Sequence, residues 1–283
     1  MSQKEKRRHL FRTFVRSKGL FACFSLLLSL LLVVGSTYAW ITSADERVNR
    51  TDANHKKLSA IVEEDFSQVF HWSPGTTKEK NIRVRNTGEV PTIVRISLKE
   101  FFVGFETDKT DNHSTGDGNG NLKVYGTPSA TTIDVKKTDT WVVGNTYGVK
   151  ANTHYKANIA LLDQTYPYKG TRTTPLPGIE LTFEAGKVFD QSSPPAANAS
   201  NYWYYEKGYF YYSEVLQPNE VTPNLLDSVS LSNAYGNQHK GALYKLVPEM
   251  EAHDLTKDLL SDWSIASSDY AYTMYQNKLD NPN

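Results

Sequence analysis

The chain has 283 residues, with 31 Lys or Arg and 31 Asp or Glu, so its formal net charge is zero. Residues 1–39 hold seven of the basic residues and one of the acidic ones, which leaves residues 40–283 with a net charge of −6. An acidic surface argues against nucleic-acid binding. The single cysteine, Cys23, lies in the first segment, so the rest of the chain has neither disulfide nor thiol chemistry and relies on its size to bury a core.

The first element in chain order is a secretory signal peptide over residues 1–39. Basic residues come first, Leu20–Val34 is apolar apart from two serines, and small residues follow. This order is typical of a signal peptide, because the basic end stays on the cytoplasmic side while the apolar part enters the bilayer as a helix. Thr37 and Ala39 are small enough for signal peptidase, so we expect cleavage between Ala39 and Trp40.

An alternative for the same stretch is an uncleaved membrane anchor. Leu20 to Ile41 is about 22 residues, roughly the length of a helix that spans a hydrocarbon core. Under this alternative the rest of the chain is a β-domain held at the cell surface.

An extended arm over residues 40–60 follows the signal. It is polar and has little apolar periodicity after its first two residues, so we expect it to be mobile at first. The remaining residues, 61–283, form the folded domain.

Two runs with period-2 alternation open that domain. Ile82 and Val84 alternate with arginines, and Val94, Ile96 and Leu98 alternate with polar residues. Alternation of this kind predicts a pair of half-buried antiparallel strands, with Gly and Pro between them for the turn.

A loop rich in Gly, Asn and Asp occupies residues 104–121. Asp117, Asn119 and Asn121 have the spacing of the first ligands of a calcium-binding EF-hand loop. A leucine stands where the turn glycine is required, however, and a proline where the bidentate glutamate is required. The sequence therefore favours a solvated loop over a calcium site.

Further strand-like runs are separated by clusters of Pro, Gly, Asn and Thr. They cover residues 121–126, 131–137, 140–144, 154–162, 178–186 and 241–252. Spacing of this kind without a strong helical period predicts a mainly β fold, a sandwich or barrel.

Residues 202–212 hold eight aromatic residues in eleven positions. The Gly208 in their middle predicts a β-hairpin whose aromatic rings pair across the strands. Burial of one aromatic face is the favoured interpretation, and a carbohydrate-binding or partner-binding surface is the alternative.

One helix is expected near the C-terminus. Leu255, Leu259, Leu260 and Trp263 recur at helical spacing.

Sequence motifs for catalysis are missing. The chain has no HExxH, no GxSxG, no phosphate-binding glycine loop and no zinc-ligand spacing. Glu249, Glu251 and His253, with Asp254 next to them, would share one face of a strand, where a solvated face is favoured over a metal site. We therefore expect no catalytic residue, no metal ligand and no cofactor.

Three blocks of sequence resemble a known family. They are GSTYAWITS at residues 35–43, WSPGTTKEKNIRVRNTGEVPTIVRISLKEF at residues 72–101 and GYFYYSEVLQPNEVTPNLLDSVSLS at residues 208–232. Together, and in this order, they resemble the TasA/camelysin family of exported Gram-positive proteins, and most of all its BsaA-like branch of biofilm-matrix and pilus-like proteins.

The resemblance implies a jelly-roll-like antiparallel β-sandwich with long loops and one or two short helices, preceded by the signal helix. It also implies export through a SipW-type signal peptidase and an extracellular or cell-surface location in a Gram-positive bacterium. In TasA-like fibres the freed N-terminal segment completes the sheet of the next subunit, which gives a head-to-tail homopolymer. The corresponding donor strand here is the arm, with Trp40, Ile41 and Val48 as its buried anchors. The membrane would then be touched only through the signal, before cleavage.

The same family contains camelysin, described as a casein-cleaving metalloprotease. A cell-surface metalloprotease is therefore the alternative function that the resemblance implies, although no residue set in the chain can be assigned to that chemistry.

Overall fold

A computed structural model describes residues 58–65, 75–108, 121–126, 133–134, 136–150, 153–232, 239 and 241–280. All of them belong to the unit formed by Val48–Asn283. The signal peptide predicted for residues 1–39 and nearly all of the arm predicted for residues 40–60 lie outside the described residues.

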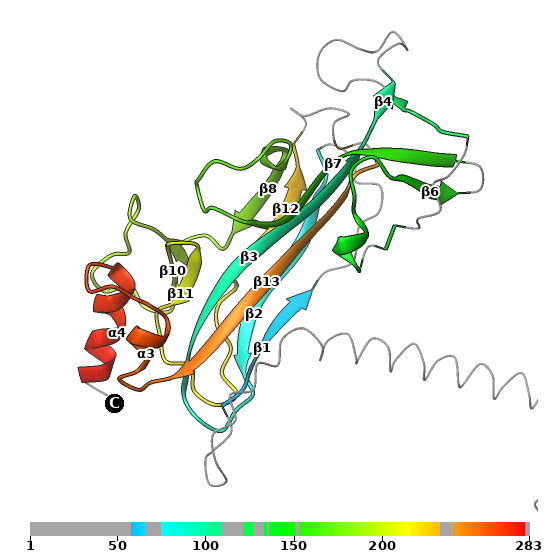
Figure 1. The fold of residues 1–283 in the computed structure, drawn as a ribbon. Helices are drawn as coiled ribbons and strands as arrows, with labels where there is room; N and C mark the ends of the chain where they lie inside the picture. The colour runs from blue at the N-terminus through cyan, green and yellow to red at the C-terminus, as the bar shows by residue number, and fades with distance from the viewer. Residues whose placement is uncertain are drawn as a thin grey trace, which may run out of the picture. The chain divides into compact units, whose positions relative to one another are not determined.

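Two β-sheets form the body of this unit (Figure 1). The four-stranded sheet has the order β1 (Ala60–Asp65), β2 (Thr77–Asn86), β12 (Leu226–Leu231) and β8 (Ile179–Phe183). The seven-stranded sheet has the order β6 (Thr146–Lys150), β7 (Thr153–Thr165), β3 (Thr92–Phe105), β11 (Tyr209–Tyr212), β10 (Trp203–Glu206) and β9 (Val188–Phe189), with β13 (Leu243–Asp254) on the other side of β3. Strands β4 (Thr107–Asp108) and β5 (Asn121–Leu122) form a separate short ladder. The pairings are antiparallel except the one between β9 and β10.

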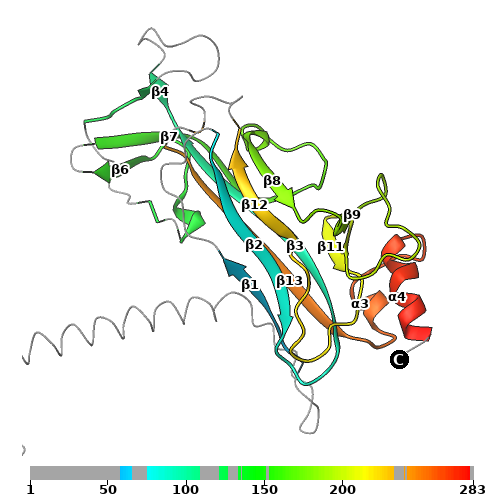
Figure 2. The ribbon, with the colours of Figure 1, turned by 180° about the vertical axis from the view of Figure 1, so that it is seen from behind.

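The two sheets face each other across one apolar core. Strand β2 contributes Ile82 and Val84, and β3 contributes Val94, Ile96 and Leu98, all with no exposed surface. Figure 2 shows β1, β2, β12 and β8 side by side, with β3 and β13 in the second sheet. The expected antiparallel β-sandwich is confirmed.

The predicted pairing of the first two alternating runs is wrong. Both runs form strands, but β2 bonds to β1 and β12, whereas β3 bonds to β13, β7 and β11. The two strands therefore lie in opposite sheets and point their aliphatic residues at each other across the core. Period-2 alternation is the same for both arrangements, because it records only which face of a strand is buried.

Asn86 organises the connection between these two strands. Its side chain has no exposed surface, its Nδ2 donates to the carbonyl oxygens of Val90 and Leu216 at 2.8 Å each, and its Oδ1 accepts the Gly88 N–H at 2.8 Å. These bonds satisfy the buried backbone groups of a chain that crosses from one sheet to the other.

Strand β3 is buried on both faces, where the sequence predicted one. Its second face carries Ile93 near its beginning and Val103 and Phe105 near its end. Ile93 packs under the C-terminal helices, and Val103 and Phe105 pack with Trp141 and Tyr147. Two smaller apolar clusters therefore lie on the outside of the seven-stranded sheet.

The aromatic hairpin is confirmed. Strands β10 and β11 pair antiparallel, and the turn residues Lys207 and Gly208 both have positive φ, at 50° and 91°. Two consecutive positive φ values give the turn the twist that a two-residue hairpin requires.

The hairpin is buried on both of its faces instead of one. Trp203 and Phe210 belong to the sandwich core. On the other face Tyr211 belongs to the cluster under the C-terminal helices, and the ring of Tyr204 stacks on Tyr270 with centroids 3.9 Å apart. The aromatic rings are thus occupied by contacts within the chain, which does not favour the carbohydrate-surface alternative.

Residues 255–280, here called the C-terminal cap, contain two helices, α3 (Leu259–Asp262) and α4 (Tyr270–Asp280). The predicted helix is confirmed in part, since Leu259 and Leu260 lie in α3 but Leu255 precedes it. The two helices agree with the one or two short helices that the resemblance implies, although no sequence pattern located α4. Its N-terminus is capped from the hairpin, where the Glu206 carboxylate accepts the N–H groups of Tyr270 and Ala271 at 3.0 and 3.1 Å.

The sandwich core encloses an ion pair between Glu100 and Arg172. Glu100 has no exposed surface, and its carboxylate accepts from both Arg172 Nε, at 3.0 Å, and Arg172 Nη2. The Tyr244 hydroxyl also donates to it at 2.8 Å, and Arg172 Nη1 donates to the Ile179 carbonyl at 2.5 Å. The pair is thereby satisfied by partners from several elements, as a buried pair must be.

Two of the predicted strands are wrong. Residues 140–144 form the end of a short 3₁₀ helix, Thr138–Thr140, followed by a turn in which Trp141 is buried. The described part of residues 131–137 contains no strand. The Trp141 indole N–H donates to the Asp134 carbonyl at 3.0 Å, and its ring packs in an apolar cluster with residues of the sheet. The apolar residues in this stretch therefore belong to a loop that packs on the sheet and not to a strand.

Candidate functional site

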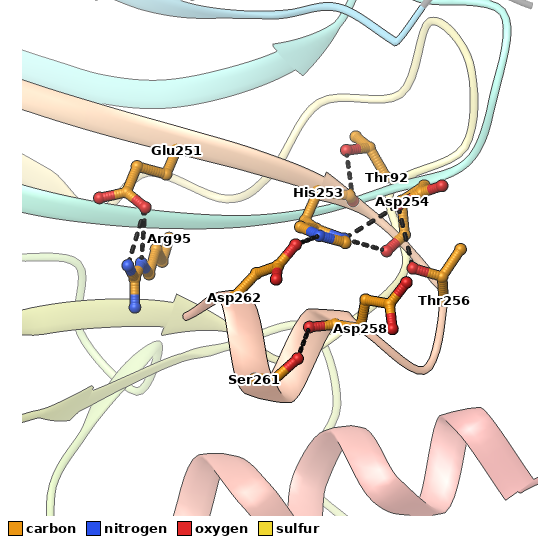
Figure 3. Close-up of polar contacts among 9 residues, drawn as sticks. All are labelled: Thr92, Arg95, Glu251, His253, Asp254, Thr256, Asp258, Ser261 and Asp262. Atoms are coloured by element: carbon orange, nitrogen blue, oxygen red, sulfur yellow. Dashed lines mark hydrogen bonds and ion pairs between the residues drawn. The ribbon is translucent and has the colours of Figure 1, made fainter. Parts of the chain in front are cut away.

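The polar residues near the end of β13 lie close to α3 and β3 (Figure 3). Glu251 forms an ion pair with Arg95, with Arg95 Nη2 and Nε at 2.7 and 3.2 Å from the same carboxylate oxygen. Glu249 accepts from the Ser97 hydroxyl at 3.5 Å. The carboxylates predicted to share a strand face therefore do so, and they face protein donors.

Arg95 is the centre of this arrangement and is only 6% exposed. Its guanidinium lies 4.0 Å from the ring centroid of Tyr209 and 4.7 Å from that of Trp263. It also donates to the Trp263 carbonyl at 3.1 Å. A planar guanidinium can stack and donate hydrogen bonds at once, so Arg95 joins β3, β11 and the C-terminal cap.

His253 lies at the end of β13, beside the same cap. Its Nε2 is 3.0 Å from an oxygen of Asp262, the last residue of α3, and its Nδ1 is 2.7 Å from the Asp254 carbonyl oxygen. Its ring meets the Trp263 ring edge-on. Burial lowers the pKa of His253, but the contacts with Asp254 and Asp262 outweigh it and leave that pKa raised.

No group of three or more His, Cys, Asp or Glu that could hold a metal ion occurs among the described residues. The metal alternative for Glu249, Glu251 and His253 is therefore not favoured. Most of the loop at residues 104–121, including Asp117 and Asn119, lies outside the described residues, so the prediction of a solvated loop stays a prediction.

The described strands also present open sheet edges. Strand β1 pairs with β2 only, and β13 pairs with β3 only. These two edge strands approach each other where the two sheets come together. The backbone groups along an edge can hydrogen-bond to a strand from another chain.

Pro248 makes the edges unequal. It lies in the middle of β13, opposite Leu98. Proline has no N–H and is tolerated in edge strands, where it hinders the addition of a further strand. Strand β1 has no proline, and its Ile61 is 37% exposed. Of the two edges, β1 is the better acceptor of an added strand.

A buried lysine lies on the core side of β2. Lys80 is 2% exposed, and burial, with a smaller effect of the Lys245 ammonium, lowers its pKa to about 7. Lys245 lies on β13.

The residues predicted for export and assembly, Ala39, Trp40, Ile41 and Val48, lie outside the described residues. In the part of the chain that the structure describes, no helix is long and apolar enough to cross a membrane. No protein-family model, no curated protein and no solved structure matches this chain. The resemblance to the TasA/camelysin family thus rests on the three sequence blocks alone.

Sequence reasoning missed Arg95 and Asp262 as partners of β13. Arg95 was placed on the solvent side of an alternating strand, and no local signal marks the cap that covers it. The sequence offered one hint, the aromatic-rich hairpin at residues 202–212, because an arginine of a neighbouring strand can stack on aromatic rings.

Proposed function

We propose that this chain is a secreted structural subunit that polymerises head to tail, with the arm of each subunit adding a strand to an open sheet edge of the next. The observation that carries the proposal is the place of β1. It is an edge strand of the four-stranded sheet, and it begins at Ala60, the last residue of the predicted arm of residues 40–60.

The physical basis is hydrogen bonding to the backbone N–H and C=O groups of an open sheet edge. An added strand supplies donors and acceptors along the edge, and its alternate side chains can enter the apolar side of the sandwich. A contact between the arm of one copy and the edge of another is heterologous, so it repeats without closing and gives a filament. The cysteine-free sandwich, the export signal and the three family-like blocks all support this role.

The first test compares assembly of the mature chain, starting at Trp40, with a variant carrying Trp40→Ala and Ile41→Asp. We expect the mature chain to form filaments in negative-stain microscopy and to sediment as large species. The variant should remain folded by circular dichroism and should sediment mainly as monomer, because an arm without apolar anchors binds the edge weakly. Unchanged assembly of the variant would overturn the role of the arm.

A second pair of variants tests the edge. Ile61→Lys places a charge on the β1 edge, and Leu162→Lys is its matched control, because Leu162 is also 37% exposed but lies on β7, in the other sheet. A lysine on an edge strand hinders strand addition. We expect Ile61→Lys to raise the concentration needed for assembly and Leu162→Lys to leave it unchanged. Equal behaviour of the two variants would exclude β1 as the acceptor.

The same preparations separate the alternatives. Chelator-sensitive cleavage of casein by the purified chain would favour the camelysin-like metalloprotease. A chain recovered from membranes with its N-terminus intact would favour an anchored surface domain.

A further inference from the structure

Both ring nitrogens of His253 face hydrogen-bond acceptors, so each of them needs an N–H group. One ring nitrogen, Nε2, faces the carboxylate of Asp262 at 3.0 Å. The other, Nδ1, faces the backbone carbonyl of Asp254 at 2.7 Å and the carboxylate of the same residue at 2.9 Å. The atoms on both sides are therefore acceptors, as Figure 3 shows.

A neutral imidazole cannot satisfy this arrangement. It carries one N–H and one lone pair, so one of its nitrogens would point a lone pair at an oxygen. The imidazolium form donates from both nitrogens and carries a charge opposite to that of the two aspartates. The geometry thus fits the protonated ring, and the raised pKa of His253 has the same physical cause.

Glu251 and Asp258 are two further acidic residues near this ring (Figure 3). On β13, Glu251 is engaged by Arg95 of β3, so this acid and this base largely compensate each other. On the cap side, Asp258 precedes α3 and its backbone carbonyl accepts from the Ser261 hydroxyl. Thr92 of β3 donates to the His253 carbonyl at 2.9 Å, which fixes the backbone but adds no charge.

The contact joins α3 to β13 next to an apolar cluster, and it adds to other polar contacts of the cap, such as the bond from Arg95 to the Trp263 carbonyl. Asp262 ends α3, and the next residue, Trp263, lies in the cluster that covers Ile93 and Tyr211 on the outside of the seven-stranded sheet. Pulling α3 away from β13 would expose that apolar face.

We propose that His253 is an acid-closed latch that ties the C-terminal cap to the end of β13. The protonated ring bridges Asp254 and Asp262, and loss of its proton opens the bridge and makes the cap easier to detach. The proposal is independent of self-assembly.

The direction of the pH effect follows from linkage. A histidine whose pKa is raised in the folded state adds stability that is complete below the pKa of the unfolded chain. This stability is lost as the pH rises through the folded pKa. Each unit between the two pKa values corresponds to a tenfold change in the opening equilibrium.

Hydrogen exchange of the mature chain tests the latch. Protection factors, corrected for intrinsic exchange, would be measured between about pH 5.5 and 8.5 for the amides of α3 and the residues after it. In the unmodified chain we expect these factors to fall by up to about tenfold across the range. In His253→Gln they should be low at acid pH and change little with pH. The same pH dependence in His253→Gln would overturn the proposal.

Asp262→Asn is a second, conservative variant, and its protection factors should depend on pH as those of His253→Gln do. The amides of strand β12 serve as an internal reference. Lys80 also titrates near neutral pH, but its effect is common to all three proteins and cancels in the comparison.

A direct measurement on the unmodified chain is the NMR titration of the His253 ring, which does not depend on whether a variant folds. A midpoint at or below that of the same histidine in the urea-unfolded chain would overturn the latch.

Discussion

The sandwich core and the C-terminal cap both rest on β3, yet they are held in different ways. The core lies between two sheets, and its ion pair Glu100–Arg172 is almost fully sealed, with side chains 1% and 9% exposed. The cap covers a single face, and two of the ion pairs beside it, Arg95–Glu251 and His253–Asp262, are open to water on the carboxylate side, with Glu251 39% and Asp262 59% exposed. Solvent can therefore reach these two cap pairs but not the Glu100–Arg172 pair.

The largest expected effect comes from breaking the sealed pair. Glu100→Gln leaves the Arg172 charge buried without a counter-charge, which should lower the free energy of unfolding by about 3–5 kcal/mol. Urea unfolding measures the loss, with the exposed Glu249→Gln on β13 as the matched control, where we expect a change within about 0.5 kcal/mol. Similar values for the two variants would mean that the pair is hydrated.

A smaller and more local effect is expected at the cap. Arg95→Lys keeps the charge but loses the planar group that stacks between Tyr209 and Trp263, at an expected cost of about 1–2 kcal/mol. Hydrogen exchange should speed up in α4 and remain slow in β12, since the lost contacts lie on the face of β3 that the cap covers. Equal acceleration in both elements would show that core and cap unfold as one unit.

The smallest effect is expected in the β10–β11 hairpin, which contacts both the core and the cap. Gly208 has φ of +91° in the hairpin turn, and a Cβ there would make only an ordinary contact with Thr165, at 3.7 Å. The cost of Gly208→Ala is therefore conformational, about 1 kcal/mol. Because the hairpin packs on the core with one face and on the cap with the other, exchange should rise in both regions. An effect confined to the cap would mean that the hairpin belongs energetically to the cap.

The sequence allowed prediction of several strands but not of their partners. Alternation located β2 and β3, and the turn residues located the β10–β11 hairpin, because both signals are local. Whether β2 bonds to β3 or faces it depends on β1, β12 and β13, and β12 and β13 lie more than a hundred residues away. A pattern within one strand carries no information about such partners.

The polar site was predicted as a set of residues and not as a set of contacts. Glu249, Glu251 and His253 share a strand face, as their spacing indicated. Their partners, Ser97, Arg95 and Asp262, come from β3 and from α3. Helix α4 escaped prediction because its apolar positions are sparse and tyrosine-rich, and because its N-terminal cap is supplied by Glu206, more than sixty residues earlier.

The ladder between β1 and β2 also has a mechanical consequence. Six consecutive register pairs join the two strands, from Ala60 opposite Asn86 to Asp65 opposite Asn81, and the Ser59 carbonyl oxygen adds a bond to the Thr87 N–H at 2.9 Å. A pull along β1 from its N-terminal end loads these bonds in shear, so they share the force and fail together. A pull across the strand would open them one at a time. The first strand of the sandwich is thus built to resist tension that enters through the chain before it.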